Sequence, residues 1–97
     1  MIVRIVKMTF QPEKVKDFLE NFDANKAKIR GFEGCEHLEL LKEEGREDVY
    51  FTYSYWQNVE ALENYRHSQL FKGVWKFTKT LFADKPQAWS VQSIDKQ

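Results

Sequence analysis

The fold of this chain is decided by residues 56–75, which read WQNVEALENYRHSQLFKGVW. The stretch opens on Trp56, the last residue of a segment rich in the aromatic and β-branched side chains that are typical of strands. Asn58 and Ser68 are good N-cap residues, and apolar side chains recur at helical spacing after each of them. The stretch therefore predicts a strand that leads directly into two consecutive helices.

The rest of the chain supplies the remaining strands and one earlier helix. Apolar alternation and an abundance of β-branched and aromatic residues predict strands at residues 2–10, 36–42, 49–56 and 88–94. The first helix is expected to begin at Pro12 and to end at Gly31, and the apolar stripe of the last helix reaches Phe82. This order of elements is that of the ferredoxin-like split β-α-β fold. We therefore predict an α+β protein with a four-stranded antiparallel sheet.

The composition predicts one small domain that needs a partner. With 97 residues the chain is expected to be a single domain, 1–97, and a domain of this size buries only about 60–65% of its unfolded surface. Aromatic residues make up 15% of the chain, more than so small a monomer readily buries. Apolar side chains occupy both faces of the first and third strands, whereas helices in this fold cover only one face. We therefore expect a homodimer in which two sheets pack face to face.

Charge and cysteine usage argue against several classes of protein. The 15 basic and 15 acidic residues cancel, so the chain lacks the positive field on which non-specific nucleic-acid binding depends. The opening residues carry charges inside an apolar run, which suits neither a signal peptide nor a membrane span. Cys35 is the only cysteine and cannot form an internal disulfide. We predict a cytoplasmic protein with no nucleic-acid or membrane partner.

No cofactor motif stands out in the sequence. His37 and His67 lie far apart, and Cys35 adds no cluster with the spacing of metal ligands. The sequence also contains no phosphate-binding loop, dinucleotide fingerprint or nucleophile elbow. We therefore expect neither a metal ion nor an organic cofactor.

The decisive stretch resembles the signature of the antibiotic-biosynthesis-monooxygenase family. In that family a Trp closes the third strand, a helix led by Asn or Asp with Glu-Ala-Leu follows, and a Ser-x-x-Phe step begins the next helix. This chain matches with Trp56, Asn58 and residues 60–62, and then with Ser68 and Phe71. The resemblance covers nearly the whole chain and implies a dimeric α/β barrel with monooxygenase, and thus oxidoreductase, activity.

Members of this family that degrade haem differ from the chain at their functional positions. They carry an Asn on the first strand, a Trp in the first paired helix and a later His, where this sequence has Val6, Tyr65 and Trp75. An indole cannot replace that imidazole as an axial ligand of haem iron. Other members carry His, His and Glu where this chain has Tyr65, Leu70 and Ser54.

The resemblance instead implies the family's simplest chemistry, that of a cofactor-independent monooxygenase acting on a phenol-, quinol- or anthrone-like molecule. Such a site needs an apolar cavity and a group that takes or stabilises a proton. Trp56, Phe71 and Trp75 are expected to bind the substrate as cavity walls. Tyr65 and His37 are the candidate catalytic residues, the first to hydrogen-bond a substrate oxygen and the second to act as the base.

Two other hypotheses are consistent with the same residues. One is a non-catalytic protein of the dimeric α/β-barrel type that binds a small apolar ligand, and the other is a purely structural dimerisation domain. In the second case Phe71 and Trp75 are ordinary core residues of one helix face, and Trp56 packs under the following helix. His37 is equally suited to the surface beside the charged hairpin. A cavity between helices and sheet that contains Tyr65 favours ligand binding.

Overall fold

Strands form where β-branched and aromatic residues cluster, and helices form where apolar residues recur three or four positions apart. The computed structural model describes residues 1–97. Its elements, in chain order, are β1 (Ile2–Thr9), a 3-10 turn η1 (Pro12–Lys14), α1 (Val15–Arg30), β2 (Cys35–Lys42), β3 (Val49–Trp56), α2 (Val59–Arg66), α3 (Gln69–Lys79) and β4 (Gln87–Val91).

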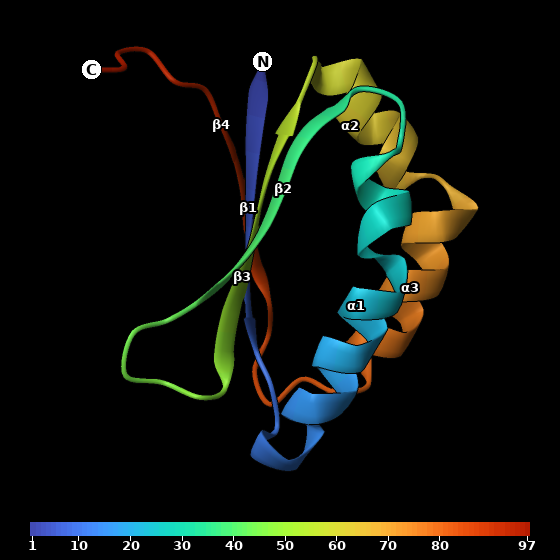
Figure 1. The fold of residues 1–97 in the computed structure, drawn as a ribbon, viewed down its shortest axis with the longest axis vertical. Helices are drawn as coiled ribbons and strands as arrows, with labels where there is room; N and C mark the ends of the chain where they lie inside the picture. Colours follow the sequence, from blue (N-terminus) through green and yellow to red (C-terminus); the bar gives the residue numbers. More distant parts are fainter.

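The four strands form one sheet in the order β2-β3-β1-β4, and each neighbouring pair is antiparallel. The three α-helices lie together on one side of this sheet, and no helix lies on its other side (Figure 1). The predicted α+β class, the ferredoxin-like order and the four-stranded antiparallel sheet are therefore confirmed. The structure describes a single chain, so the predicted pairing of two sheets stays a prediction.

The two consecutive helices begin at their predicted caps. The side-chain oxygen of Asn58 accepts a hydrogen bond from the backbone N–H of Ala61 at 2.8 Å. Ser68 Oγ accepts one from the backbone N–H of Phe71 at 3.1 Å, and it donates to the carbonyl oxygen of Tyr65 at 2.6 Å. Ser68 therefore ties the end of α2 to the start of α3, and this brings Tyr65 close to Phe71.

The last helix is shorter than its apolar stripe predicts. α3 ends at Lys79, although the stripe continues to Phe82. The carbonyl oxygen of Leu81 accepts a hydrogen bond from the backbone N–H of Gln11 at 3.0 Å, and Phe82 forms a β-bridge with Phe10. Contacts with the chain beyond β1 therefore hold this segment out of the helix, while Leu81 remains buried as its apolar character requires.

The last strand is also shorter than predicted. β4 ends at Val91, which pairs with Val3, whereas alternation predicts a strand up to Ile94. β1 is the only neighbour of β4 and begins at Ile2, so residues beyond Val91 have almost no strand left to pair with. Ile94 is accordingly 96% exposed.

The buried core is divided between the two ends of the space between helices and sheet. One cluster gathers around Phe10 and Phe18, whose rings stack at 4.2 Å. The other cluster gathers around Trp56 and Leu62 at the opposite end of β3. Only 13 of the 97 residues are buried, so the core of the single chain is thin.

The helix-free face of the sheet is rich in apolar and aromatic side chains. Ile5 lies between Tyr53 on β3 and Trp89 on β4, and residues paired side by side in a sheet point to the same face. Trp89 is 43% exposed although it is a large aromatic residue. A surface of this kind on a small chain is typical of a protein–protein interface.

Candidate functional site

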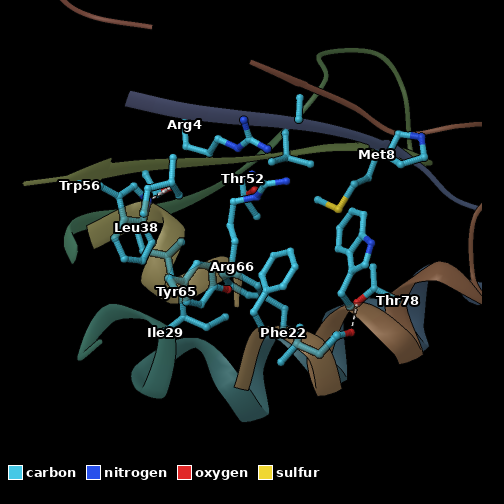
Figure 2. A pocket seen from close by; sticks show the side chains of 18 of the residues that line it. Arg4, Met8, Phe22, Ile29, Leu38, Thr52, Trp56, Tyr65, Arg66 and Thr78 are labelled. Atoms are coloured by element: carbon cyan, nitrogen blue, oxygen red, sulfur yellow. Dashed lines mark hydrogen bonds between the residues drawn. The ribbon is translucent and has the colours of Figure 1, made fainter. Parts of the chain in front are cut away.

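A cavity of about 320 Å³ lies between the helices and the covered face of the sheet, with side chains converging on it from both layers (Figure 2). This volume is at the small end of the range of about 300–1,000 Å³ that is usual for ligand pockets. Its lining is mostly apolar and comes from all four strands and all three α-helices. The space is therefore not filled as in a purely structural core, and it suits a small, flat, apolar molecule.

One wall of the cavity is a continuous row of aromatic rings. The indole of Trp56 stacks on the ring of Tyr65, with centroids 4.8 Å apart, and Tyr65 meets Phe71 edge-on at 5.2 Å. Phe71 in turn stacks on Trp75 at 5.8 Å, with 12° between the rings. The three predicted wall residues and Tyr65 are thus brought together in one cavity.

Trp56 serves the core as well as the cavity. Its side chain is 1% exposed and packs against Leu62 of α2, as expected for a Trp at a strand end beneath a helix. Its Nε1 donates a hydrogen bond to Ser54 Oγ at 3.0 Å, so the indole satisfies its own polar group inside the lining. Trp56 therefore forms a fixed end wall.

Tyr65 is the one phenol that lines the cavity, and it points inward because it shares a helix face with Leu62. Its hydroxyl forms no hydrogen bond within the protein, and since no fully buried side-chain oxygen or nitrogen lacks a partner, this hydroxyl is not completely enclosed. Burial raises the pKa of Tyr65 above the ordinary phenol value, and the charge of Cys35 raises it further. The phenol is therefore neutral at physiological pH and available as a hydrogen-bond donor.

His37 lies on the other face of the sheet and is not brought together with the aromatic wall. It pairs with Tyr55 across β2 and β3, and their rings are 4.8 Å apart. Its Nε2 lies 3.0 Å from a carboxylate oxygen of Glu39, and the hydroxyls of Tyr53 and Tyr55 are 3.0 Å apart beside it. No His, Cys, Asp or Glu lines the cavity.

Two arginines that line the cavity were not predicted from the sequence. Arg4 projects from β1 and Arg66 from the end of α2, and their side chains extend toward each other across the cavity (Figure 2). Alternation offered a signal for Arg4, because it interrupts the apolar face that Ile2, Val6 and Met8 share. Arg66 carried no comparable signal, since a basic residue in the last turn of a helix is common.

The residues described here also lack a metal-binding cluster. No group of three His, Cys, Asp or Glu side chains is close enough to hold a metal ion. Trp75 lines the cavity where haem-degrading members are expected to have their ligand His, and it presents an indole ring to the space.

The sequence was compared with protein-family profiles and with curated proteins. A sequence profile described as antibiotic biosynthesis monooxygenase matches residues 1–75, which is most of the chain. The chain belongs to this family. A search of the curated proteins finds no match.

Solved structures with the same fold include several family members. A putative antibiotic biosynthesis monooxygenase from Caulobacter crescentus CB15 is 21% identical, with a TM-score of 0.89 over 97% of this chain and 90% of that chain. One from Nitrosomonas europaea is 13% identical, with a TM-score of 0.90 over 98% of this chain and 100% of that chain. A conserved protein from Methanosarcina mazei Go1 is 18% identical, with a TM-score of 0.88 over 95% of this chain and 92% of that chain. Such low identities establish the shared fold alone.

No helix of this chain is both long enough and apolar enough to cross a membrane.

Proposed function

We propose that the protein is a homodimeric, cofactor-independent monooxygenase that acts on a small phenol-, quinol- or anthrone-like aromatic molecule. The observation that carries this proposal is the cavity of about 320 Å³ with its row of aromatic rings and the neutral phenol of Tyr65. The rings offer flat apolar surfaces for a flat substrate, and the phenol offers one directed hydrogen bond. Membership of the monooxygenase family supports the same reaction class.

The proposed reaction uses dioxygen as the only oxidant. The substrate loses a proton to become a resonance-stabilised carbanion, which transfers electrons to dioxygen and forms a carbon–oxygen bond. Protonation of the resulting peroxide gives a hydroperoxide, whose O–O bond breaks as the carbon loses its second proton. The products are a new carbonyl group and one water molecule, so a methylene carbon and dioxygen yield a ketone and water.

Tyr65 is the residue to which we assign a catalytic role in this reaction. Its hydroxyl donates to the substrate oxygen on which negative charge accumulates when the carbon is deprotonated, and this stabilises the anion. The apolar lining excludes water from the peroxide intermediate. We assign no step to His37, because it faces away from the cavity beside Tyr55.

The homodimer is proposed from the exposed face of the sheet. Trp89 and Val91 are each 43% exposed, and Leu41 is 39% exposed on the same helix-free surface. A second copy that packs its sheet on this face buries these side chains by two-fold symmetry. Cys35 is a free, buried thiol, and a reducing compartment such as the cytoplasm keeps it in this form.

One observation favours a second candidate function, the binding of a small apolar ligand without turnover. The cavity lining contains no carboxylate and no imidazole, so no ordinary general base faces a bound molecule. In the oxygenase proposal the substrate must then lose its proton to solvent water or hydroxide before the cavity encloses it, and Tyr65 stabilises the anion that binds. The two functions differ in whether dioxygen is consumed.

Oxygen uptake with an anthrone tests the proposal. The purified protein, with a chelator present, is mixed with 1,8-dihydroxyanthrone, and uptake is recorded beside a protein-free sample that measures spontaneous oxidation. We expect uptake above that background, one dioxygen per anthrone, and one labelled oxygen in the new carbonyl when isotopically labelled dioxygen is supplied. Tyr65→Phe should lower kcat/KM by about tenfold or more, because a hydrogen bond to a developing anion is lost.

The matched control is Tyr53→Phe, which also removes one phenol oxygen but on the far face of the sheet. It should leave the rate per folded dimer unchanged. Binding of the anthrone without uptake above background would reject the oxygenase and leave the binding protein. Equal losses in the two variants would remove Tyr65 from the proposed mechanism.

A further inference from the structure

The cavity contains two positive charges and no negative charge. Arg4 and Arg66 are its only charged lining residues, and most of the other residues around them are apolar. Guanidinium groups stay protonated in proteins at any physiological pH. Two like charges that share a mostly apolar cavity repel each other, so the arrangement costs free energy unless an anion completes it.

Arg4 is the less compensated of the two. Its side chain is half-buried, and its guanidinium donates one hydrogen bond to Ser90 Oγ at 3.0 Å. Ser90 is neutral, and no carboxylate lies within ion-pair distance of Arg4, so its other N–H groups remain available. Burial lowers the pKa of Arg4 and the nearby charge of Arg66 lowers it further, while the charge of Glu63 offsets part of this change.

Arg66 has one carboxylate partner outside the cavity lining. It forms an ion pair with Glu63, one turn earlier on α2, at 3.0 Å, and each side chain is 43% exposed. An exposed pair of this kind contributes little to the free energy of folding, so the Arg66 guanidinium can also bind a second anion with little loss of stability. Arg66 thus faces Arg4 with N–H groups still free.

We propose that Arg4 and Arg66 form an anion-binding subsite, and that the cavity takes a flat aromatic molecule that carries a carboxylate. The carboxylate lies between the two guanidinium groups, which match its two oxygens in a forked, bidentate arrangement. The ring system lies along the aromatic wall that Tyr65 and Trp75 share with Phe71. This inference narrows the substrate class of the proposed function and rests on that function only where turnover is concerned.

The first test compares two probes of nearly identical shape in the unmodified protein. 1-Hydroxy-2-naphthoate and 1-hydroxy-2-naphthamide differ in the charge of one group, and each is titrated by calorimetry at the same pH and salt. We expect the carboxylate to bind at least about tenfold more tightly than the amide, as hydrogen bonds between charged groups imply. Equal affinities would overturn the inference without any variant having to fold.

The second test removes the charges one at a time. Arg4→Gln and Arg66→Gln should each reduce the preference for the carboxylate about tenfold or more while leaving amide affinity within about twofold. Arg46→Gln is the matched control, since Arg46 is also paired with a carboxylate but lies in the turn between β2 and β3, outside the cavity lining. It should leave both affinities unchanged.

Glu63→Gln should change binding in the opposite direction. It frees Arg66 from its ion pair, so we expect carboxylate affinity to rise about two- to fivefold, the scale of an exposed salt bridge. If Arg66 has only a structural role, Glu63→Gln should give no such gain in carboxylate affinity. A result with no gain in Glu63→Gln and an unchanged probe preference in Arg66→Gln would refute the subsite.

The binding tests separate this inference from the proposed reaction. Carboxylate preference that depends on both arginines supports the subsite even if the anthrone is never oxidised. Oxidation of the anthrone with no preference between the two naphthalene probes supports the reaction and overturns the subsite.

Discussion

Tyr65→Phe removes one oxygen atom and so tests whether Tyr65 lines a ligand cavity or belongs to an ordinary core. In the structure the Tyr65 hydroxyl has no hydrogen-bond partner in the protein, while its ring contacts Trp56 and Phe71. Phenylalanine keeps these ring contacts, so the free energy of unfolding should change by no more than about 0.5 kcal/mol. A hydroxyl with a buried partner would instead cost about 1–2 kcal/mol, because that partner would be orphaned.

The same change should weaken ligand binding, because the cavity loses one of its few polar donors. For a hydroxynaphthoquinone whose oxygen accepts from Tyr65, a lost neutral hydrogen bond of about 0.5–1.5 kcal/mol corresponds to a roughly two- to twelvefold rise in Kd. Urea melts give the stability, and titration of the intrinsic fluorescence gives the Kd. A variant that is destabilised by more than 1 kcal/mol and keeps the affinity of the unmodified protein would refute the reasoning.

Five other outcomes follow from the same structure. Because burial raises the pKa of Tyr65 in the folded state, its neutral phenol supports folding fully below the unfolded pKa of about 10 and loses that contribution as pH rises above it; urea melts in alkaline buffer should show a steeper loss for the unmodified protein than for Tyr65→Phe. Gly73→Ala should stabilise α3 by about 0.5–1 kcal/mol, since a Cβ at that exposed position meets nothing. Gly34→Ala should cost more than about 1 kcal/mol in the same melts, because Gly34 has φ +89° and its Cβ would collide with a side chain of α2. Phe51→Asp, on the helix-free face, should leave little folded dimer and little stable monomer in sedimentation, and a clean 11.6 kDa monomer of the unmodified chain at micromolar concentration would contradict the dimer. Haem and a reductant should yield no ring-opened product, and a histidine-like optical spectrum abolished by Trp75→Ala would contradict this expectation.

Elements that depend on interactions between residues close together in the chain could be predicted from the sequence. Asn58 and Ser68 begin their helices because a side-chain oxygen reaches a backbone N–H three residues later, an interaction that needs no distant partner. Residues 49–56 form a strand as predicted, with β-branched and aromatic side chains on both faces. The end of α3 could not be predicted, because contacts of Leu81 and Phe82 with the distant residues Phe10 and Gln11 determine it.

Helical spacing also predicted much of the aromatic wall. Phe71 and Trp75 are four residues apart on α3 and therefore face the same way, and the short link at Ser68 brings Tyr65 beside them. The same spacing suits a filled core equally well. That a cavity remains between the two buried clusters depends on the volumes of side chains from every element at once, which no local pattern records.

The sequence by itself determined the order of elements, their caps and the alternation of side chains along each strand, because these follow from local spacing and backbone chemistry. Alternation assigns His37 and Arg4 to one of two faces but does not say which face the helices cover. Only the packing of the helices on the sheet placed Arg4 in the cavity opposite Arg66 and left His37 outside it. The chemistry of the site was therefore decided by the tertiary structure, since it depends on charges that are distant in the chain and meet only after folding.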